Sequence, residues 1–170
     1  NTWLVGVNDS ANNKNMSRIT FFKDTITPLI DYGTGTENSG VNVSRNWIYV
    51  NVTWTEINFA NITFTLKNDS ATINSTTFTT AIYTINWTNL PNGNYTYFVN
   101  ITDSANNKNS TAIRSVTLDT IYPSLVLLSP ANNSGDNDGN ISFIFNVTDL
   151  NSVAGNIINC SLVINNAVNS

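Results

Sequence analysis

Apolar and polar residues alternate one by one over long parts of this chain. Between residues 48 and 54 every second side chain is apolar, and the same alternation runs through 61–66, 83–88, 94–102 and 141–148. A strand points successive side chains to opposite faces, so this period of two predicts half-buried β-strands. The longest candidate segments lack apolar residues at the i, i+3, i+4 and i+7 positions of an amphipathic helix. The chain is therefore predicted to be all-β.

Turn-forming residues separate the alternating segments, and the helical crossovers that a parallel sheet needs are missing from the pattern. This arrangement is typical of an antiparallel β-sandwich. In the turn at 90–94, Pro91 precedes Asn92 and Gly93, two residues that tolerate positive φ. Strands are predicted at 2–7, 17–22, 28–32, 42–44, 47–54, 61–67, 71–74, 81–86, 95–102, 112–118, 125–128, 141–148 and 157–164.

The chain also repeats itself. The seven residues 9–15 recur unchanged at 103–109, and the segment 23–29 resembles 118–124. The distance from Asp9 to Asp103, 94 residues, is the length of a small β-sandwich. We interpret residues 1–24 as the end of one repeat, 25–119 as one complete repeat and 120–170 as the opening of a third.

Composition narrows the function classes. Apolar residues make up 41% of the chain, enough for a core, but charged residues only 11%, against about 25% in an ordinary soluble domain. The net charge is −4 and the seven Lys and Arg residues are scattered, which argues against a nucleic-acid partner. No apolar run approaches the roughly 20 residues of a membrane span.

Asn-x-Ser/Thr sequons are unusually frequent. Within a strand, the Asn and the Thr of a sequon share one face, and at Asn51, Asn61, Asn86, Asn94 and Asn100 that face is the polar one. A glycan there would not enter the core. The alternative is that a chain rich in Asn, Ser and Thr forms sequons by chance, since Thr also favours strands. The sequons begin at Asn8, Asn15, Asn42, Asn51, Asn61, Asn68, Asn74, Asn86, Asn94, Asn100, Asn109, Asn132, Asn140, Asn146 and Asn159.

Residues 90–97, Leu-Pro-Asn-Gly-Asn-Tyr-Thr-Tyr, resemble the turn and tyrosine corner of fibronectin type III and immunoglobulin (Ig)-like sandwiches. Tyr95 stands at the matching position, which implies a bond from its hydroxyl back to the turn. Together with 127–134 and 159–162, the pattern resembles the tandem Ig-like repeats of archaeal cell-surface proteins, such as S-layers or filaments. The resemblance implies a complete Ig-like domain at 25–119, parts of two others at 1–24 and 120–170, and an extracellular, glycosylated protein at the cell surface.

The resemblance also carries a departure. Similar repeats often pair a Cys at the position of Cys160 with one on the sixth strand, but Val7 and Ile101 stand at the matching positions here. No disulfide within a domain is therefore expected. Cys160 is interpreted as a small buried hydrophobe, with an intermolecular disulfide as the alternative.

Few residues suit catalysis. The chain has no His and one Cys, which removes most catalytic triads and transition-metal sites, and its eleven carboxylates form no pair that the pattern places on one face. We expect no enzyme and no cofactor other than N-linked glycans. The loop 135–140 has oxygen ligands on alternate residues but lacks a distal Glu, so turn formation is preferred and calcium is the alternative.

Two further groups have structural interpretations. Asp9 and Asp103 precede the repeated loop and are expected to bond to downstream backbone amides. Aromatic residues could form a carbohydrate-binding platform, but most point inward on their strands, so core packing is preferred. These aromatic residues are Trp47, Trp54, Phe64, Tyr83 and Trp87, and Trp3, which aligns with Tyr97, is assigned to a core as well.

The two outer segments are complementary parts of a repeat. Joined, they would form a sandwich that lacks about twenty residues. Each would expose apolar strand faces when alone. Our hypothesis is that residues 1–24 of one copy pair with 120–170 of the next, a head-to-tail contact that does not close and that builds a filament or surface layer. The alternative is one long polypeptide of tandem Ig-like spacers in an adhesin or carbohydrate-binding stalk.

Overall fold

A computed structural model describes residues 1–149, 153, 157–164 and 167–169. All regular structure in this part is β, as predicted. The third predicted repeat, 120–170, includes residues outside the described set. The strands are β1 (Thr2–Asn8), β2 (Lys14–Thr20), β3 (Leu29–Tyr32), β4 (Val41–Val43), β5 (Ile48–Thr55), β6 (Phe59–Asn68), β7 (Thr72–Phe78), β8 (Thr84–Trp87), β9 (Gly93–Asp103), β10 (Lys108–Ser110), β11 (Arg114–Leu118), β12 (Ser124–Ser129), β13 (Ile144–Thr148), β14 (Leu162–Ile164) and β15 (Ala167–Asn169).

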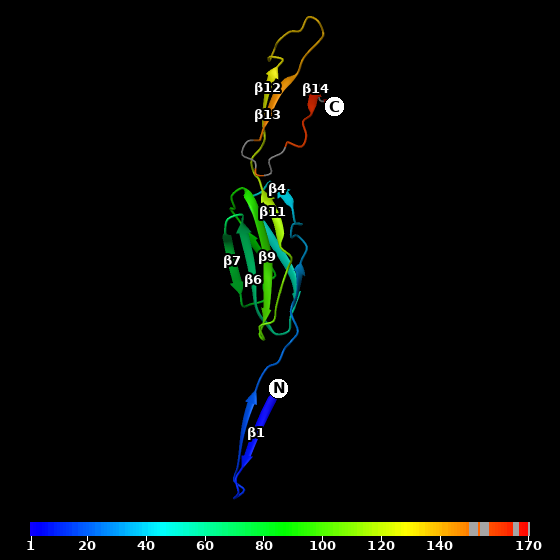
Figure 1. Cartoon of the computed structure of the whole chain (residues 1–170). Coiled ribbons are helices and arrows are strands. Elements are labelled where there is room, and N and C mark those ends of the chain that lie inside the picture. Colours follow the sequence, from blue (N-terminus) through cyan, green and yellow to red (C-terminus); the bar gives the residue numbers. More distant parts are fainter. Residues whose placement is uncertain (150–152, 154–156, 165–166, 170) are drawn as a thin grey trace.

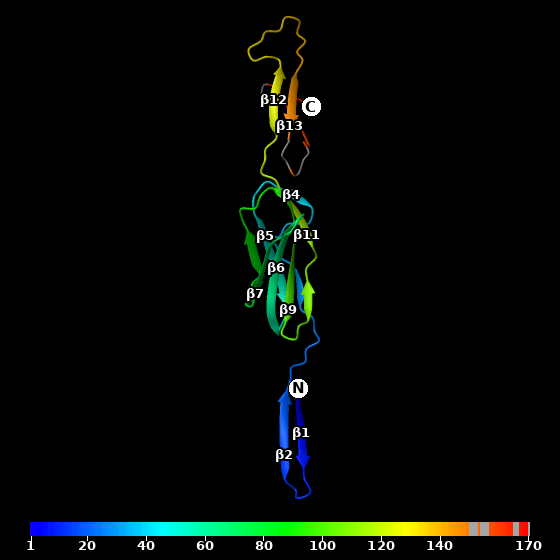
Figure 2. The same cartoon turned by 60° about the vertical axis from the view of Figure 1, so that its left-hand side comes forward.

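The strands form three bodies along an elongated molecule. The hairpin β1–β2 lies at one end, a sandwich built from β3 to β11 lies in the middle, and the pairs β12–β13 and β14–β15 lie at the other end (Figures 1 and 2). The sandwich has one sheet of order β3-β5-β8 and a second of order β4-β11-β9-β6-β7, with β10 added to β9. The pairs within it are antiparallel except for β4 with β11, which run parallel.

The predicted apolar faces form the core of this sandwich. The inward-facing side chains of β5, β6 and β9 pack between the two sheets, and most of them have no exposed surface. Full burial of one such side chain contributes about 1.5–3 kcal/mol, so these three strands supply much of the stability of the sandwich. The fully or almost fully buried residues on the three strands are Ile48, Val50, Val52, Ile62, Phe64, Leu66, Tyr97, Val99 and Ile101.

A polar network closes one end of this core. Burial raises the pKa of Tyr97 to about 12, and its hydroxyl donates to the Glu37 carbonyl oxygen at 2.9 Å. Arg114 donates to the same carbonyl at 2.8 Å and lies 4.1 Å from the centre of the Tyr32 ring. The loop that contains Glu37 is thereby fixed against β9 and β11.

The prediction for the aromatic residues was right in part. Phe64 and Trp87 are buried, and Trp54 is half-buried in a stack between Phe59 and Tyr83, with ring centres 4.8 and 5.1 Å away. Core packing was wrong for Trp47 and Tyr83, which are 38% and 47% exposed. Trp47 is out of phase with the buried positions of β5, whereas Tyr83 is in phase with Trp87 but lies just before β8, where its ring stacks on Trp54.

Several strand bounds differ from the prediction. The strand expected at 157–164 is limited to β14, and the one expected at 112–118 begins only at Arg114. The short strand β10 was not predicted. In the turn before β9, positive φ falls on Asn89 (57°) and not on Asn92 or Gly93. Asn92 instead accepts bonds from the backbone N–H and the hydroxyl of Thr120.

An inserted residue explains the break between β10 and β11. The two repeated hairpins start with the same register, Val7 opposite Asn15 and Ile101 opposite Asn109. Further along, Trp3 faces Ile19, but Tyr97 faces Arg114, one position later than its counterpart. The central copy has one extra residue before its next Asp, and the strand bulges at 111–113 to absorb it. The Ala112 carbonyl oxygen in this bulge accepts a bond from the Tyr32 hydroxyl at 2.7 Å.

Candidate functional site

The repeated loop has the same conformation in both copies. Oδ1 of Asp103 accepts bonds from the backbone N–H of Ala105 (2.9 Å) and of Asn107 (2.8 Å), and Oδ2 accepts from the Asn107 side chain (2.7 Å). Asp9 makes the same three bonds, at 2.9, 2.9 and 2.7 Å. Asn106 and Asn12 have φ of 69° and 66°. These are the expected side-chain turn bonds, and they lower the pKa of Asp9, chiefly through the Asn13 side chain.

The segments that precede β3 and β12 match as well. Oδ1 of Asp24 accepts a bond from the N–H of Ile26 at 2.9 Å, and Oδ1 of Asp119 accepts one from the N–H of Ile121 at 3.0 Å. The Ile26 amide, followed by the Asn58 side chain at 2.8 Å, lowers the pKa of Asp24. The same turn therefore precedes both β3 and β12.

Acidic oxygen atoms gather where the first linker meets the central sandwich. Among the described residues, Asp24, Glu56 and Asp103 each bring one carboxylate oxygen within 4.8 Å of the others. Oxygen ligands of this kind suit a hard cation such as Ca²⁺. Asp103 is 2% exposed, but its oxygens already accept bonds from its own loop. Nothing in the sequence pattern joined these three residues, because they come from a linker, from the loop after β5 and from the end of β9.

The other calcium candidate, the loop 135–140, is a set of turns. Oδ2 of Asp136 accepts a bond from the N–H of Gly139 at 2.6 Å, and Oδ1 of Asp138 accepts one from the N–H of Asn140 at 2.9 Å. Gly139 has a φ of 76°, in the left-handed region. The preferred interpretation, turn formation, matches this geometry.

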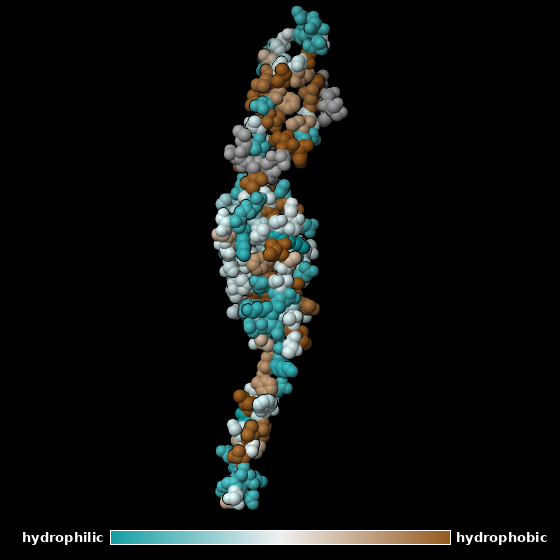
Figure 3. All heavy atoms as spheres, in the orientation of Figure 1, coloured by the Kyte–Doolittle hydropathy of each residue, from teal (hydrophilic) through white to brown (hydrophobic). Residues whose placement is uncertain are grey.

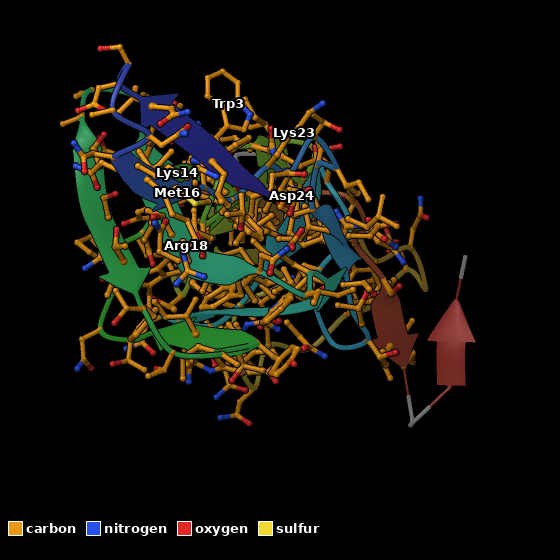
Figure 4. The ribbon with its side chains drawn as sticks, turned by 90° about the horizontal axis from the view of Figure 1, so that it is seen from below. Trp3, Lys14, Met16, Arg18, Lys23 and Asp24 are labelled. Atoms are coloured by element: carbon orange, nitrogen blue, oxygen red, sulfur yellow. The ribbon has the colours of Figure 1, made fainter. Side chains whose placement is uncertain are left out.

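The hairpin β1–β2 exposes the face that its counterpart buries. Trp3, Val5 and Val7 are 65, 61 and 63% exposed, whereas their counterparts on β9, namely Tyr97, Val99 and Ile101, are fully buried. Figure 4 shows Trp3 on one side of the hairpin and Lys14, Met16 and Arg18 on the other. The assignment of Trp3 to a core was wrong for this chain, because no described residues form a facing sheet.

The opposite end of the molecule has a matching apolar face. Hydrophobic residues gather over β12 and β13, while the surface of the central sandwich is mostly hydrophilic or intermediate (Figure 3). β12 and β13 face a groove that the segment 157–162 closes on one side. Its apolar lining includes Leu125, Leu127, Phe145, Val147, Cys160 and Leu162.

Cys160 is free and exposed, so its expected burial was wrong for this chain. Its predicted strand neighbour Ile158 is 97% exposed. In the central sandwich the equivalent strand, β6, lies between β7 and β9. Among the described residues β14 pairs with β15 alone.

No Asn of a predicted sequon is buried, but two donate from the side-chain amide nitrogen to a backbone carbonyl oxygen. Nδ2 of Asn51 donates to the Thr34 carbonyl oxygen at 2.9 Å and lies 2.8 Å from where a Cβ on Gly33 would stand. Nδ2 of Asn109 donates to the Pro28 carbonyl oxygen at 2.9 Å. Asn51, Asn61, Asn74 and Asn100 are half-buried; Asn8, Asn15, Asn42, Asn68, Asn86, Asn94, Asn109, Asn132, Asn140, Asn146 and Asn159 are exposed.

Tyr95 lies at the start of β9, and its hydroxyl donates to the Pro91 carbonyl oxygen at 2.9 Å, the bond of a tyrosine corner. The strand order of the two sheets matches such sandwiches too. The central fold is fibronectin type III-like. In the part of the chain that the structure describes, no helix is long and apolar enough to cross a membrane.

Comparisons with known proteins give distant similarities. The chain is similar to the fibronectin(III)-like modules of Clostridium thermocellum CbhA, with 18% identity, 55% of this chain and 99% of that chain covered, and a TM-score of 0.42. It is also similar to dimeric latent PorU from Porphyromonas gingivalis (15% identity, 69% of this chain and 12% of that one, TM-score 0.41) and to an engineered protein (15%, 54% and 20%, 0.41). No protein-family model and no curated protein matches the sequence.

Proposed function

We propose that this chain is a structural subunit of an extracellular, glycosylated filament or surface layer, of the kind built from Ig-like repeats on archaeal cells. Residues 1–24 of one copy pair with 120–170 of the next, head to tail. One observation carries the proposal: Trp3, Val5 and Val7 are exposed on the hairpin, although the same positions form the core of the central sandwich. Apolar strand faces of this kind favour association.

The charges of the two ends support this pairing. The segment 1–24 contains Lys14, Arg18 and Lys23 against two acids. The segment 120–170 contains Asp136, Asp138 and Asp149 and no Lys or Arg. Opposite net charges steer encounter between two surfaces, although they add little to affinity once the surfaces are exposed to salt.

Glycans on the exposed sequons fit the low charge of the chain. With charged residues at only 11%, hydration has to come from amides, hydroxyls and sugars. Asn86 lies exposed on β8, where a sugar would extend into solvent. A surface made in this way belongs to a protein that is exported and glycosylated.

Light scattering combined with electron microscopy tests the assembly. The purified chain is expected to form oligomers whose mass grows with concentration, and linear polymers in micrographs. Trp3→Asp places a charge on the apolar face of β1 and should leave a monomer. Leu4→Asp is the matched control, since the neighbouring residue points to the other face and should leave assembly intact.

Two outcomes would contradict the proposal. A chain that stays monomeric at all concentrations lacks the contact, and the apolar faces then belong to repeats within one long adhesin or carbohydrate-binding stalk. Equal effects of Trp3→Asp and Leu4→Asp would show that the apolar face of β1 is not what drives association.

A further inference from the structure

The central sandwich contains, within one chain, the contact that the two ends would make between chains. Its strands β6 and β9 pair antiparallel, with Ile62 opposite Ile101, Phe64 opposite Val99 and Leu66 opposite Tyr97. All six side chains are fully buried. The partners of such a contact at the ends can be identified from the repeat, residue by residue.

On the hairpin side, the identical loops fix the correspondence. Asp9 and Asp103 make the same bonds and start the same turn, so positions differ by a constant 94 residues along β1 and β9. Val7 therefore corresponds to Ile101, Val5 to Val99 and Trp3 to Tyr97.

On the other side, the sequon at Asn159 corresponds to the one at Asn61, and the strand that follows has the same alternation. This makes Cys160 the counterpart of Ile62, Leu162 of Phe64 and Ile164 of Leu66. The groove supports this orientation independently. Cys160 and Leu162 line it together with residues of β12 and β13, as Ile62 and Phe64 pack in one core with residues of β5.

We propose that β1 of a second copy pairs antiparallel with residues 159–164, with Val7 opposite Cys160, Val5 opposite Leu162 and Trp3 opposite Ile164. This inference rests on the proposed head-to-tail assembly and specifies its register. The pairing occupies the edge of β14 that, among the described residues, has no neighbouring strand. It also covers the apolar faces of both partners, whose net charges are opposite in sign.

The one native cysteine makes the register measurable. Residues directly opposite in an antiparallel pair have Cα atoms about 4.5–5.5 Å apart, within the range of a disulfide. Val7→Cys should therefore crosslink to Cys160 of the next copy under mild oxidation with copper phenanthroline, giving a ladder of covalent oligomers on a non-reducing gel. Val7 is 63% exposed, so the substitution leaves the core of the central sandwich intact.

Three controls isolate the register. Trp3→Cys lies on the same face but four residues along the strand, roughly 13 Å from Cys160, and should not crosslink. Gly6→Cys is next to Val7 but points to the other face, where a Cβ has only ordinary contacts with Met16 and Asn15. Val7→Cys combined with Cys160→Ser should give no ladder.

The failure of the register is distinguishable from the failure of assembly. If scattering shows oligomers but Val7→Cys crosslinks no better than Trp3→Cys or Gly6→Cys, the register is wrong and the assembly stands. If the parent and all variants are monomeric in scattering and give no ladder, both proposals fall. A ladder limited to Val7→Cys supports both.

Discussion

At the scale of single residues, the same motif has different consequences in different places. Asn51 and Asn86 both lie in sequons on paired strands, β5 and β8. Asn86 is exposed, whereas the amide of Asn51 is bonded to the Thr34 carbonyl and packs against Gly33. A sugar on Asn51 would have to displace that packing, so the sequon alone does not decide whether the site can be used.

We therefore predict that Asn86 is glycosylated and Asn51 is not when the chain is made in a host that attaches N-linked sugars. Glycopeptide mass spectrometry measures the occupancy of each site in the same sample, so Asn86 serves as the internal control. Occupancy of Asn51 equal to that of Asn86 would show that the folded contact has no influence on modification.

At the scale of elements, two hairpins that share the same seven-residue loop have different neighbours. The loop that starts at Asp103 lies against the central sandwich, where Ser104 donates its N–H to the Asn58 carbonyl at 2.7 Å. The loop that starts at Asp9 makes the same internal bonds in solvent. Burial therefore decides how much each Asp contributes to stability.

Asp103→Ala is expected to lower the free energy of unfolding by about 2–3 kcal/mol, because three bonds to a buried carboxylate are lost and their half-buried donors lose this acceptor. Asp9→Ala, the matched control, should leave the unfolding of the sandwich unchanged, since water replaces the carboxylate. Urea unfolding followed by tryptophan fluorescence compares the two variants. Similar losses for both would mean that the first hairpin unfolds together with the sandwich.

The strand pattern was predictable from the sequence because one face of each central strand is buried. The buried residues of β5 and β9 follow the period of two, and in β6 Thr65 is buried out of phase. The bulge at 111–113 was not predicted from the alternation, although the sequence contains its trace, since the stretch from the repeated loop to the next Asp is one residue longer in the central copy. The burial of Trp3 and Cys160 failed for another reason: alternation shows which face is apolar, but not whether anything covers it.

At the scale of the whole molecule, the described chain has one self-contained core. The buried cluster lies entirely between Ile48 and Leu118, and the linker contacts at Asp24 and Thr120 close it at either end. The acidic cluster at the first linker was also outside the reach of the sequence pattern, because only the fold brings Glu56 and Asp103 together.

An excised fragment of residues 23–120 is thus expected to fold alone and to unfold in one cooperative step. Circular dichroism and tryptophan fluorescence should give coincident urea transitions with the midpoint of the sandwich in the full chain. Transitions that do not coincide, or a fragment without a cooperative transition, would show that the hairpin or β12–β13 is needed for the fold.

The hairpin β1–β2 and the strand pairs β12–β13 and β14–β15 lie at opposite ends of the elongated chain (Figure 1). A polymer joined through them is directional, since every subunit points the same way and the two tips present different chemistry. At one end of such a polymer the groove beside β12 and β13 has no partner hairpin, and at the other end the hairpin β1–β2 has no partner groove. Each end could therefore be blocked separately. A chain that has only the hairpin or only the groove would cap one end of the polymer and leave the other end free to grow.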